Sequence, residues 1–348
     1  MSAVASKRQN LQELLFPRGI PPLWCPSLTH FDAGRRIDLG RMEAHLTWMM
    51  PHVKGYLVPG STGDGWDLDD AETETVVRFA VDMARKRGVS LLLGALRKNT
   101  VDVTGSIEKF LDILRKLTGK TDPLAALLAA GVGGFTVCPP AGKDLDQATI
   151  GAALEIMLDM GLPVALYQLP QVTGNETAPE TFARLVAKYP NLILFKDSSG
   201  ADRIALSGVD ARGVFLVRGA EGNYARWLRA AGGTYDGFLL STANSFPAEL
   251  LAVVDGIREG RLDEALRIST ALSGAVGEVF GLVGEIPCGN AFTNANKAIE
   301  HFMAFGPAAV ERQGPMLHGG IRIPAGIITA TGDILRRYGL MPERGYLA

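Results

Sequence analysis

Residues 191–200 read Asn-Leu-Ile-Leu-Phe-Lys-Asp-Ser-Ser-Gly, an apolar run that ends in Lys196. A second run at residues 163–170, Pro-Val-Ala-Leu-Tyr-Gln-Leu-Pro, carries Tyr167 near its end. Lysine is rarely buried because its charge is costly to desolvate, so a lysine that closes a buried strand indicates a chemical role. An amine whose pKa is lowered by an apolar pocket, with a phenol nearby, is typical of enzymes that form Schiff bases.

Eight apolar runs of this kind alternate with amphipathic helical stretches. The expected strands are residues 22–28, 55–59, 90–96, 134–139, 163–169, 192–197, 215–219 and 237–241. No tight hairpin joins two of them, which favours a parallel sheet. Eight strands over about 250 residues are typical of a (β/α)8 (TIM) barrel. A doubly wound sheet is the alternative, although no Gly-x-Gly-x-x-Gly follows the first strand.

The predicted α/β fold therefore has three parts. Residues 1–17 form an N-terminal arm, residues 18–258 the (β/α)8 barrel, and residues 259–348 a C-terminal helical subdomain. The connection at residues 98–131 is longer than its neighbours and is expected to be a two-helix insertion. By periodicity, helices are expected after the last strand at residues 247–258, 262–283, 290–305 and 324–338.

Composition excludes several classes of protein. The chain has 348 residues, of which 47% are hydrophobic, so it can bury a sizeable core. A net charge of -2 gives no indication of nucleic-acid or membrane-surface binding. Cys25, Cys138 and Cys288 lack disulfide or zinc-ligand spacing. With no apolar run of the ~18 residues that a membrane span needs, the protein is expected to be soluble and cytoplasmic.

Polar residues follow the second strand, where the chemistry of a barrel is found. Residues 59–65 read Pro-Gly-Ser-Thr-Gly-Asp-Gly. The glycines let backbone N–H groups face a ligand, and the hydroxyls of Ser61 and Thr62 add donors, which suits a carboxylate or phosphate. The segment is not a P-loop, because no Gly-Lys-Ser/Thr follows. A plain turn is the alternative.

Taken singly, Tyr167 could be a core tyrosine, and Lys196 could form an ion pair with Asp197. Neighbours on a strand point to opposite faces, which weakens that pairing. The conjunction of Ser/Thr, Tyr and Lys at three strand ends, in this order, indicates a common site.

Four segments resemble motifs of the dihydrodipicolinate synthase / N-acetylneuraminate lyase superfamily of Schiff-base barrels. They are Gly-Ser-Thr-Gly-Asp at 60–64, Tyr-Gln-Leu-Pro at 167–170, Phe-Lys-Asp-Ser-Ser-Gly at 195–200, and the eighth strand with its loop at 237–244. The resemblance covers nearly the whole chain. It also implies the C-terminal helical region and a homo-oligomer, either a dimer or a tetramer.

The resemblance implies catalytic roles for Lys196 and Tyr167. Lys196 would attack the ketone of a 2-oxo acid such as pyruvate, and Tyr167 would transfer protons. The residues assigned to substrate binding are Gly60, Ser61, Thr62 and Leu239. No organic cofactor or metal is expected, because the lysine imine itself draws electrons.

Two departures from the family pattern bear on the substrate. In the true synthase an arginine follows the tyrosine motif and holds the second substrate's carboxylate, whereas this chain has Val172. The fourth strand, which usually ends in Pro-Tyr-Tyr, ends here in Cys-Pro-Pro-Ala at 138–141 and so lacks a proton-relaying tyrosine. Gln168 and Asp64 are milder changes from asparagine and glutamate.

Other polar residues admit two interpretations each. His30 is either an acid/base at the barrel mouth or a satisfied histidine, and Glu221 could contact distal hydroxyls of a substrate. Cys138 is expected to be a small buried hydrophobe, and Asn244 to stabilise the loop after strand eight. His318 and Arg322 are expected to be interface or packing residues.

The main hypothesis is a lyase or aldolase that makes or breaks a C–C bond of a 2-oxo acid, with an aldehyde as the second partner. A 2-keto-3-deoxy sugar acid dehydratase would use the same imine. Dihydrodipicolinate synthase itself comes third because of Val172. A non-catalytic barrel that binds a 2-oxo acid is the contrasting class.

Overall fold

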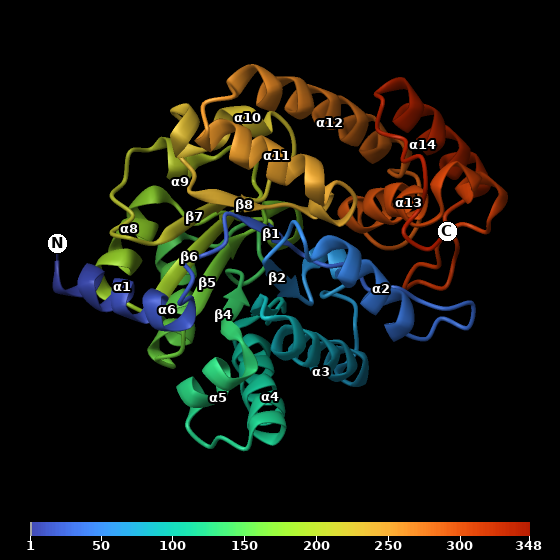
Figure 1. Cartoon of the computed structure of the whole chain (residues 1–348). Helices are drawn as coiled ribbons and strands as arrows, with labels where there is room; N and C mark the ends of the chain where they lie inside the picture. Colours follow the sequence, from blue (N-terminus) through green and yellow to red (C-terminus); the bar gives the residue numbers. More distant parts are fainter. Residues whose placement is uncertain (1) are drawn as a thin grey trace.

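Eight short parallel strands pair in chain order and the last pairs with the first, so the sheet closes into a barrel (Figure 1). The computed structural model describes residues 2–348. The strands are β1 (Leu23–Cys25), β2 (Gly55–Val58), β3 (Ser90–Gly94), β4 (Val132–Val137), β5 (Val164–Gln168), β6 (Leu192–Asp197), β7 (Phe215–Arg218) and β8 (Gly237–Leu239). The (β/α)8 barrel expected from the sequence is confirmed, and the doubly wound alternative is wrong because β8 closes onto β1.

Helices surround the barrel and extend beyond β8. They are α1 (Ala3–Leu15), α2 (Leu39–Met49), α3 (Asp70–Arg87), α4 (Thr100–Thr118), α5 (Pro123–Ala130), α6 (Gln147–Asp159), α7 (Pro170–Thr173), α8 (Pro179–Lys188), α9 (Arg203–Leu206), α10 (Tyr224–Trp227), α11 (Pro247–Arg258), α12 (Leu262–Leu282), α13 (Ala291–Phe305) and α14 (Ala325–Arg337). Short 3-10 turns are η1 (Ser61–Gly63), η2 (Arg229–Ala231), η3 (Ser241–Asn244) and η4 (Gly306–Glu311).

The connection between β3 and β4 contains α4 and α5, which match the two helical pieces expected there. The first expected piece spans residues 105–117, and helix α4 begins five residues earlier, at Thr100. The side chain of Asn99 caps the helix there by accepting from the Asp102 N–H. Both helices end at a glycine in the left-handed conformation, Gly119 and Gly131. Across residues 2–348, no helix has the length and apolar character needed to cross a membrane.

Helix α1 closes the barrel at the amino ends of the strands (Figure 1). Leu15 and Phe16 join the apolar layer inside the barrel that includes Trp24 and Ile193. Arg8 is buried and donates to the carbonyl oxygens of Leu192 and Tyr189 at 2.7 Å each, and to those of Val186 and Arg212. Burial lowers the pKa of Arg8 to about 10. The expected N-terminal arm is therefore a helical plug.

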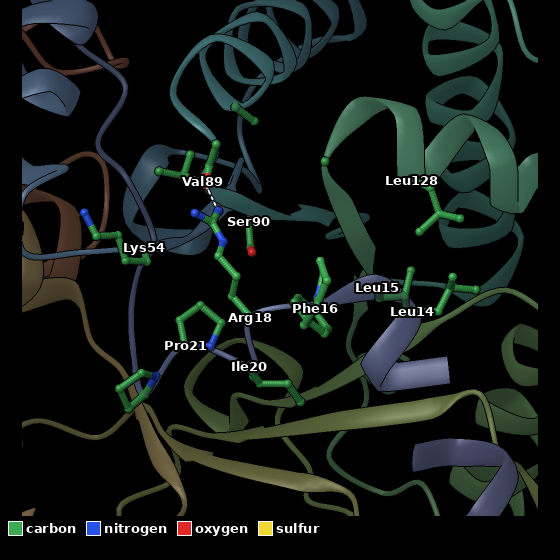
Figure 2. A pocket seen from close by; sticks show the side chains of 16 residues that line it. Leu14, Leu15, Phe16, Arg18, Ile20, Pro21, Lys54, Val89, Ser90 and Leu128 are labelled. Carbon is green, nitrogen blue, oxygen red and sulfur yellow. Dashed lines mark hydrogen bonds between the residues drawn. The ribbon is translucent and has the colours of Figure 1, made fainter. Parts of the chain in front are cut away.

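A cavity of about 520 Å³ lies beside the end of this plug, between Phe16, Pro21, Val89 and Leu128 (Figure 2). The guanidinium of Arg18 also lines it and donates to the carbonyl of Gly88. This cavity lies at the amino ends of the strands, whereas the chemistry of (β/α)8 barrels occurs at the carboxyl ends. It is therefore not the catalytic site.

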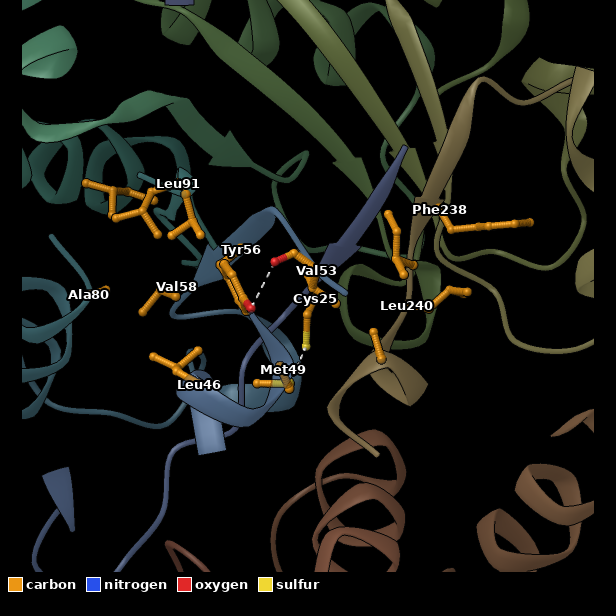
Figure 3. Packing of buried hydrophobic residues seen from close by; sticks show 14 of the residues in the cluster. Cys25, Leu46, Met49, Val53, Tyr56, Val58, Ala80, Leu91, Phe238 and Leu240 are labelled. Carbon is orange, nitrogen blue, oxygen red and sulfur yellow. Dashed lines mark hydrogen bonds between the residues drawn. The ribbon is translucent and has the colours of Figure 1, made fainter. Parts of the chain in front are cut away.

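Apolar residues between the strands and the outer helices form a continuous core (Figure 3). Figure 3 shows Tyr56 and Cys25 in this layer: the Tyr56 hydroxyl donates to the Val53 carbonyl at 3.2 Å, and Cys25 Sγ lies 3.8 Å from Met49 Sδ. At the opposite end of the barrel from α1, helix α13 contacts η1 and η3 (Figure 1). The C-terminal helices thus reach the carboxyl ends of the strands.

Candidate active site

Lys196 and Tyr167 lie side by side at the carboxyl ends of adjacent strands. They are direct partners in the parallel register of β5 and β6. Lys196 is 3% exposed and Tyr167 2% exposed. The Lys196 Nζ atom lies 4.0 Å from the centroid of the Tyr167 ring. The structure thus brings together the two residues predicted to be catalytic.

The surroundings of Lys196 favour the uncharged amine. Burial lowers the pKa of Lys196 to about 7, and Cys138, Glu221 and Cys25 only partly oppose this effect. Gly219 makes room for the side chain, because a Cβ atom at that position would lie 2.7 Å from Lys196 Cε. A substantial fraction of the amine is therefore neutral, and nucleophilic, near pH 7.

The phenol of Tyr167 is protonated at neutral pH. Burial raises the pKa of Tyr167 and Cys138 adds to the increase, while the hydroxyls of Ser61 and Ser198 act in the opposite direction. A phenol with a raised pKa retains its proton until a stronger base forms beside it. Tyr167 is thus equipped to donate a proton to an oxyanion that forms close to Lys196.

The turn expected to bind a carboxylate is held from two sides. Ser61 and Thr62 are buried in η1, and the indole Nε1 of Trp66 donates to Ser61 Oγ at 2.7 Å. From α13, Asn290 Nδ2 donates to the Ser61 carbonyl at 3.1 Å and Thr293 Oγ1 to the Thr62 carbonyl at 3.0 Å. The sequence interpretation missed both α13 contacts. Asn290 could have been recognised as a helix cap, but its partner lies 229 residues away.

A buried ion pair fixes the end of the same turn. Asp64 has a left-handed backbone, with φ at 60°, and its carboxylate lies 3.0 Å from Lys297 Nζ. Both side chains are almost fully buried. Removal of one partner would leave the other charged and unpaired in the core. Lys297 therefore positions the turn, a role that the sequence did not suggest.

An apolar surface lies beside the phenol of Tyr167. It contains the buried side chains of Leu96, Cys138 and Leu169, against which three partly buried side chains pack. These three are Trp66, Val172 and Phe292. We call these six residues the apolar wall. The burial of Cys138 in it agrees with the expectation of a small buried hydrophobe.

Leu239 lies in β8 and packs in the apolar layer inside the barrel, with Leu194 and Val217. Its assignment to substrate binding stays a prediction. Glu221, after β7, accepts from Ser241 Oγ at 2.6 Å and from the Tyr224 hydroxyl at 2.9 Å. These donors hold the Glu221 carboxylate in place, and its charge acts to raise the pKa of Lys196, against the larger effect of burial.

His30 is a satisfied buried histidine. Its Nε2 lies 3.0 Å from His45 Nδ1, and His45 Nε2 lies 2.7 Å from the Asn244 carbonyl. Burial holds the pKa of His30 well below its usual range. His30, His45 and Glu300 have ligand atoms within 4.8 Å of one another. However, Arg41 donates to both Glu300 oxygens, at 2.9 and 2.8 Å, so this carboxylate is already neutralised.

The remaining polar candidates are structural. Asn244 donates to the carbonyls of Ser241 and Pro26 at 2.8 and 3.0 Å, and so stabilises the loop after β8 as expected. His318 Nε2 lies 3.0 Å from a Glu72 oxygen, and Arg322 donates to the Gly314 carbonyl at 2.8 Å, so both are packing residues. The alternative ion pair between Lys196 and Asp197 is not found within residues 2–348, because neighbouring side chains on β6 point to opposite faces of the sheet. Asp197 Oδ1 accepts from the Ser199 N–H at 2.9 Å.

Fold and site together define a (β/α)8 barrel enzyme with a buried lysine near the carboxyl end of its sixth strand. The model of the dihydrodipicolinate synthetase family matches residues 128–280, which include Tyr167 and Lys196. Over this segment the chain is similar to that family, and its fold is the fold of solved members of the family.

Individual proteins are similar to this chain in sequence or in structure. The 4-hydroxy-tetrahydrodipicolinate synthase of Xanthomonas campestris pv. campestris is 29% identical over 223 residues, covering 64% of this chain and 67% of that protein. YagE of E. coli, solved in complex with pyruvate, has a TM-score of 0.72 at 19% identity and covers 92% of this chain and 99% of its own. Dihydrodipicolinate synthase of Aquifex aeolicus has a TM-score of 0.68 at 18% identity, covering 93% and 100%.

Proposed function

We propose that this protein is a lyase of the dihydrodipicolinate synthetase family, and that it makes or breaks a C–C bond of a pyruvate-type 2-oxo acid through an imine on Lys196. The observation that carries the proposal is the buried amine, with its pKa near 7, placed 4.0 Å from the centre of the Tyr167 ring. A structural lysine in this position would need a carboxylate partner, and the adjacent Asp197 points to the opposite face of β6. A nucleophilic lysine needs the desolvated environment that is observed.

The reaction follows from the chemistry of the two side chains. The neutral Nζ of Lys196 attacks the ketone carbon, and the Tyr167 hydroxyl protonates the oxygen that leaves as water. The resulting iminium draws electrons from C3, so that a C3–H bond or a C3–C4 bond breaks heterolytically. In the synthetic direction C3 then attacks an aldehyde carbon. Hydrolysis of the imine returns the lysine and releases the 2-oxo acid product.

The carboxylate of the 2-oxo acid would bind at Gly60 and η1. Ser61 and Thr62 offer hydroxyl groups there, and short 3-10 turns present backbone N–H groups that have no partner within the turn. The contacts from Asn290 and Thr293 fix this turn before the substrate arrives. Binding through a rigid turn would place the ketone beside Lys196.

Relatives support the substrate class. YagE was solved with pyruvate, and the curated relatives are named as synthases of 4-hydroxy-tetrahydrodipicolinate. Val172 stands where the true synthase has its arginine, so we infer that the second substrate of this chain differs from that of the synthase. We also infer a cytoplasmic homo-oligomer, either a dimer or a tetramer.

The test is a cleavage assay on a panel of 4-hydroxy-2-oxo acids, with released pyruvate measured by a coupled dehydrogenase. We expect pyruvate release by the natural chain and none by Lys196→Ala. Lys120→Ala is the matched control, because Lys120 is exposed. A 2-keto-3-deoxy sugar acid in the same panel separates the alternatives, because dehydration yields no pyruvate and shifts the product mass by one water. Full activity of Lys196→Ala would reject both.

A further inference from the structure

The apolar wall packs against Tyr167 and includes large hydrophobic side chains from four different parts of the chain. Trp66 follows η1, Leu96 follows β3, Val172 lies in α7, and Phe292 comes from the first turn of α13. Trp66, Val172 and Phe292 are only partly buried, so they retain surface that a ligand can cover. All of them pack against the cluster that contains Tyr167, the proposed proton donor.

The wall is rigid. Trp66 is fixed by its hydrogen bond to Ser61 Oγ at 2.7 Å. Phe292 packs edge-on against Phe280 of α12, with ring centroids 5.5 Å apart. Aromatic side chains held in this way bind flat or branched apolar groups with little loss of conformational entropy.

None of the six side chains of the apolar wall is charged, and the basic residue next to Leu96 in the chain, Arg97, is engaged elsewhere. The groups that act electrostatically on Lys196 are Cys138, Glu221 and Cys25, and none of them is basic. Arg97, next to Leu96, donates to the Leu96 carbonyl at 2.8 Å and lines a cavity of about 270 Å³ between α3 and α4. A carboxylate pressed against the wall would therefore lose its hydration without gaining a partner.

We propose that the apolar wall is the binding site for the aldehyde partner, and that this partner carries an aromatic or branched apolar group instead of a carboxylate. The inference rests on the proposed function, and it names the substrate class that the function leaves open. Val172 is then a specificity-determining residue, because it extends the wall at the place where the true synthase has an arginine.

The covalent steps balance without another reagent. Loss of a C3 proton from the Lys196 iminium gives an enamine, and its C3 attacks the aldehyde carbon to form one C–C bond. The C3 proton goes to the Tyr167 phenolate that imine formation leaves, the aldehyde oxygen then takes a proton from Tyr167, and the water that hydrolyses the imine returns a proton to Tyr167. One water then cleaves the C–N bond and releases a 4-hydroxy-2-oxo acid with free Lys196. The water lost when the imine formed is thereby replaced.

The experiment compares two aldehydes of similar shape. The protein is incubated with pyruvate and either 4-methylpentanal or 4-oxobutanoate, in which a carboxylate replaces the branched apolar end, and the adducts are quantified by mass spectrometry. Benzaldehyde is the aromatic member of the panel. We expect kcat/KM for the apolar aldehydes to exceed that for 4-oxobutanoate by about tenfold or more.

Val172→Arg is expected to lower the preference for apolar aldehydes over 4-oxobutanoate at least tenfold, because the guanidinium can pair with the carboxylate of 4-oxobutanoate. Val172→Met controls for the length of the side chain, and Val101→Arg controls for added charge at an exposed position of α4. Both controls should retain the preference for the apolar aldehydes. In parallel, borohydride trapping of pyruvate alone reports whether the imine forms.

The outcomes are distinct. The inference is supported if the imine is trapped and if the natural chain prefers the apolar aldehydes while Val172→Arg loses this preference. Trapping together with an equal or greater rate for 4-oxobutanoate overturns the inference and leaves the proposed function in place. Absence of trapping overturns both.

Discussion

The burial of Lys196 makes its amine reactive and lowers the stability of the folded state. The amine is almost fully buried beside a phenol, and its pKa falls from 10.5 to about 7 because burial disfavours the charged form. The same burial that makes the amine nucleophilic also makes its protonated form unfavourable in the folded state. Both consequences can be measured separately.

The rate of imine formation should follow the neutral fraction of Lys196. We expect the initial rate of borohydride trapping, at pyruvate well below saturation, to rise with pH through a midpoint of about 7 and to level off above it. Exposed lysines would give a midpoint above 10. A trapping rate that still rises steeply between pH 8.5 and 10 would show that the amine is not perturbed as described.

Replacement of Lys196 by methionine should stabilise the fold, most strongly at low pH. Below pH 7 the folded natural chain must hold a buried charged amine. Between pH 7 and 10.5, Lys196 is protonated more often in the unfolded chain than in the folded chain, so the free energy of unfolding of the natural chain rises with pH. The advantage of Lys196→Met should therefore shrink by on the order of 2 kcal/mol between pH 7 and 9. Denaturant unfolding at the two pH values measures it, and an advantage that does not change with pH would contradict the linkage.

At the residue scale, the sequence was enough to place Lys196 and Tyr167 at adjacent strand ends, because strand order in a barrel follows chain order. It was not enough for Asn290, Thr293 and Lys297. Their partners lie more than 200 residues away, and a polar residue in an amphipathic helix has the same pattern whether it faces water or a buried turn. His30 remained ambiguous for the same reason, because its partner His45 lies on α2.

Helix α13 and turn η1 act as one element of the site. Thr293 is fully buried and its hydroxyl donates to the carbonyls of Thr62 and Ser61, at 3.0 and 3.3 Å. The C-terminal helices therefore contribute to the site although they lie outside the barrel.

Thr293→Val keeps the shape of the side chain and removes this donor. We expect a loss of about 1–2 kcal/mol in the free energy of unfolding and a severalfold rise in KM for the 2-oxo acid. The pH midpoint of trapping should not change, because Lys196 is untouched. Thr293→Ser retains the hydroxyl and should restore KM. An unchanged KM in Thr293→Val would show that α13 does not position the turn.

Helix α1 is an element whose importance the sequence understated. Arg8 donates to four carbonyl groups at the closed end of the barrel, those of Val186, Tyr189, Leu192 and Arg212. Arg8→Met should lower the free energy of unfolding by about 2–4 kcal/mol, with the pH midpoint of trapping unchanged. Exposed Lys7 provides the matched control, since Lys7→Met should change stability by less than about 0.5 kcal/mol. Equal effects of the two changes would contradict the role given to Arg8.

At the scale of the whole molecule, the alternation of strands and helices in the sequence predicted the fold. Each of the eight strands lies where the sequence predicted it. Most strands are shorter than the apolar runs, because residues at the ends of the runs, such as Leu96 and Leu169, pack in the apolar wall instead of pairing in the sheet. The closure of the sheet was inferred from the number of strands. The wall itself could not be foreseen, because it joins side chains from five separate segments.

The assembly of the molecule is a prediction at this scale. Light scattering at micromolar concentration should give a mass two or four times the 37.1 kDa of the chain. Leu262 and Leu266, one turn apart on α12, are 51% and 59% exposed, and burial of such side chains between subunits would be favourable. A mass of a single chain under these conditions would refute the oligomer.

The most direct measurement is the intact mass after incubation with pyruvate and sodium borohydride, followed by peptide mapping. Borohydride reduces the imine to a stable secondary amine. The account predicts one added pyruvyl group per chain, on the peptide that contains Lys196, and none in Lys196→Ala. No adduct on folded protein with pyruvate or longer 2-oxo acids, or an adduct on another lysine, would contradict the proposal that this protein works through Lys196.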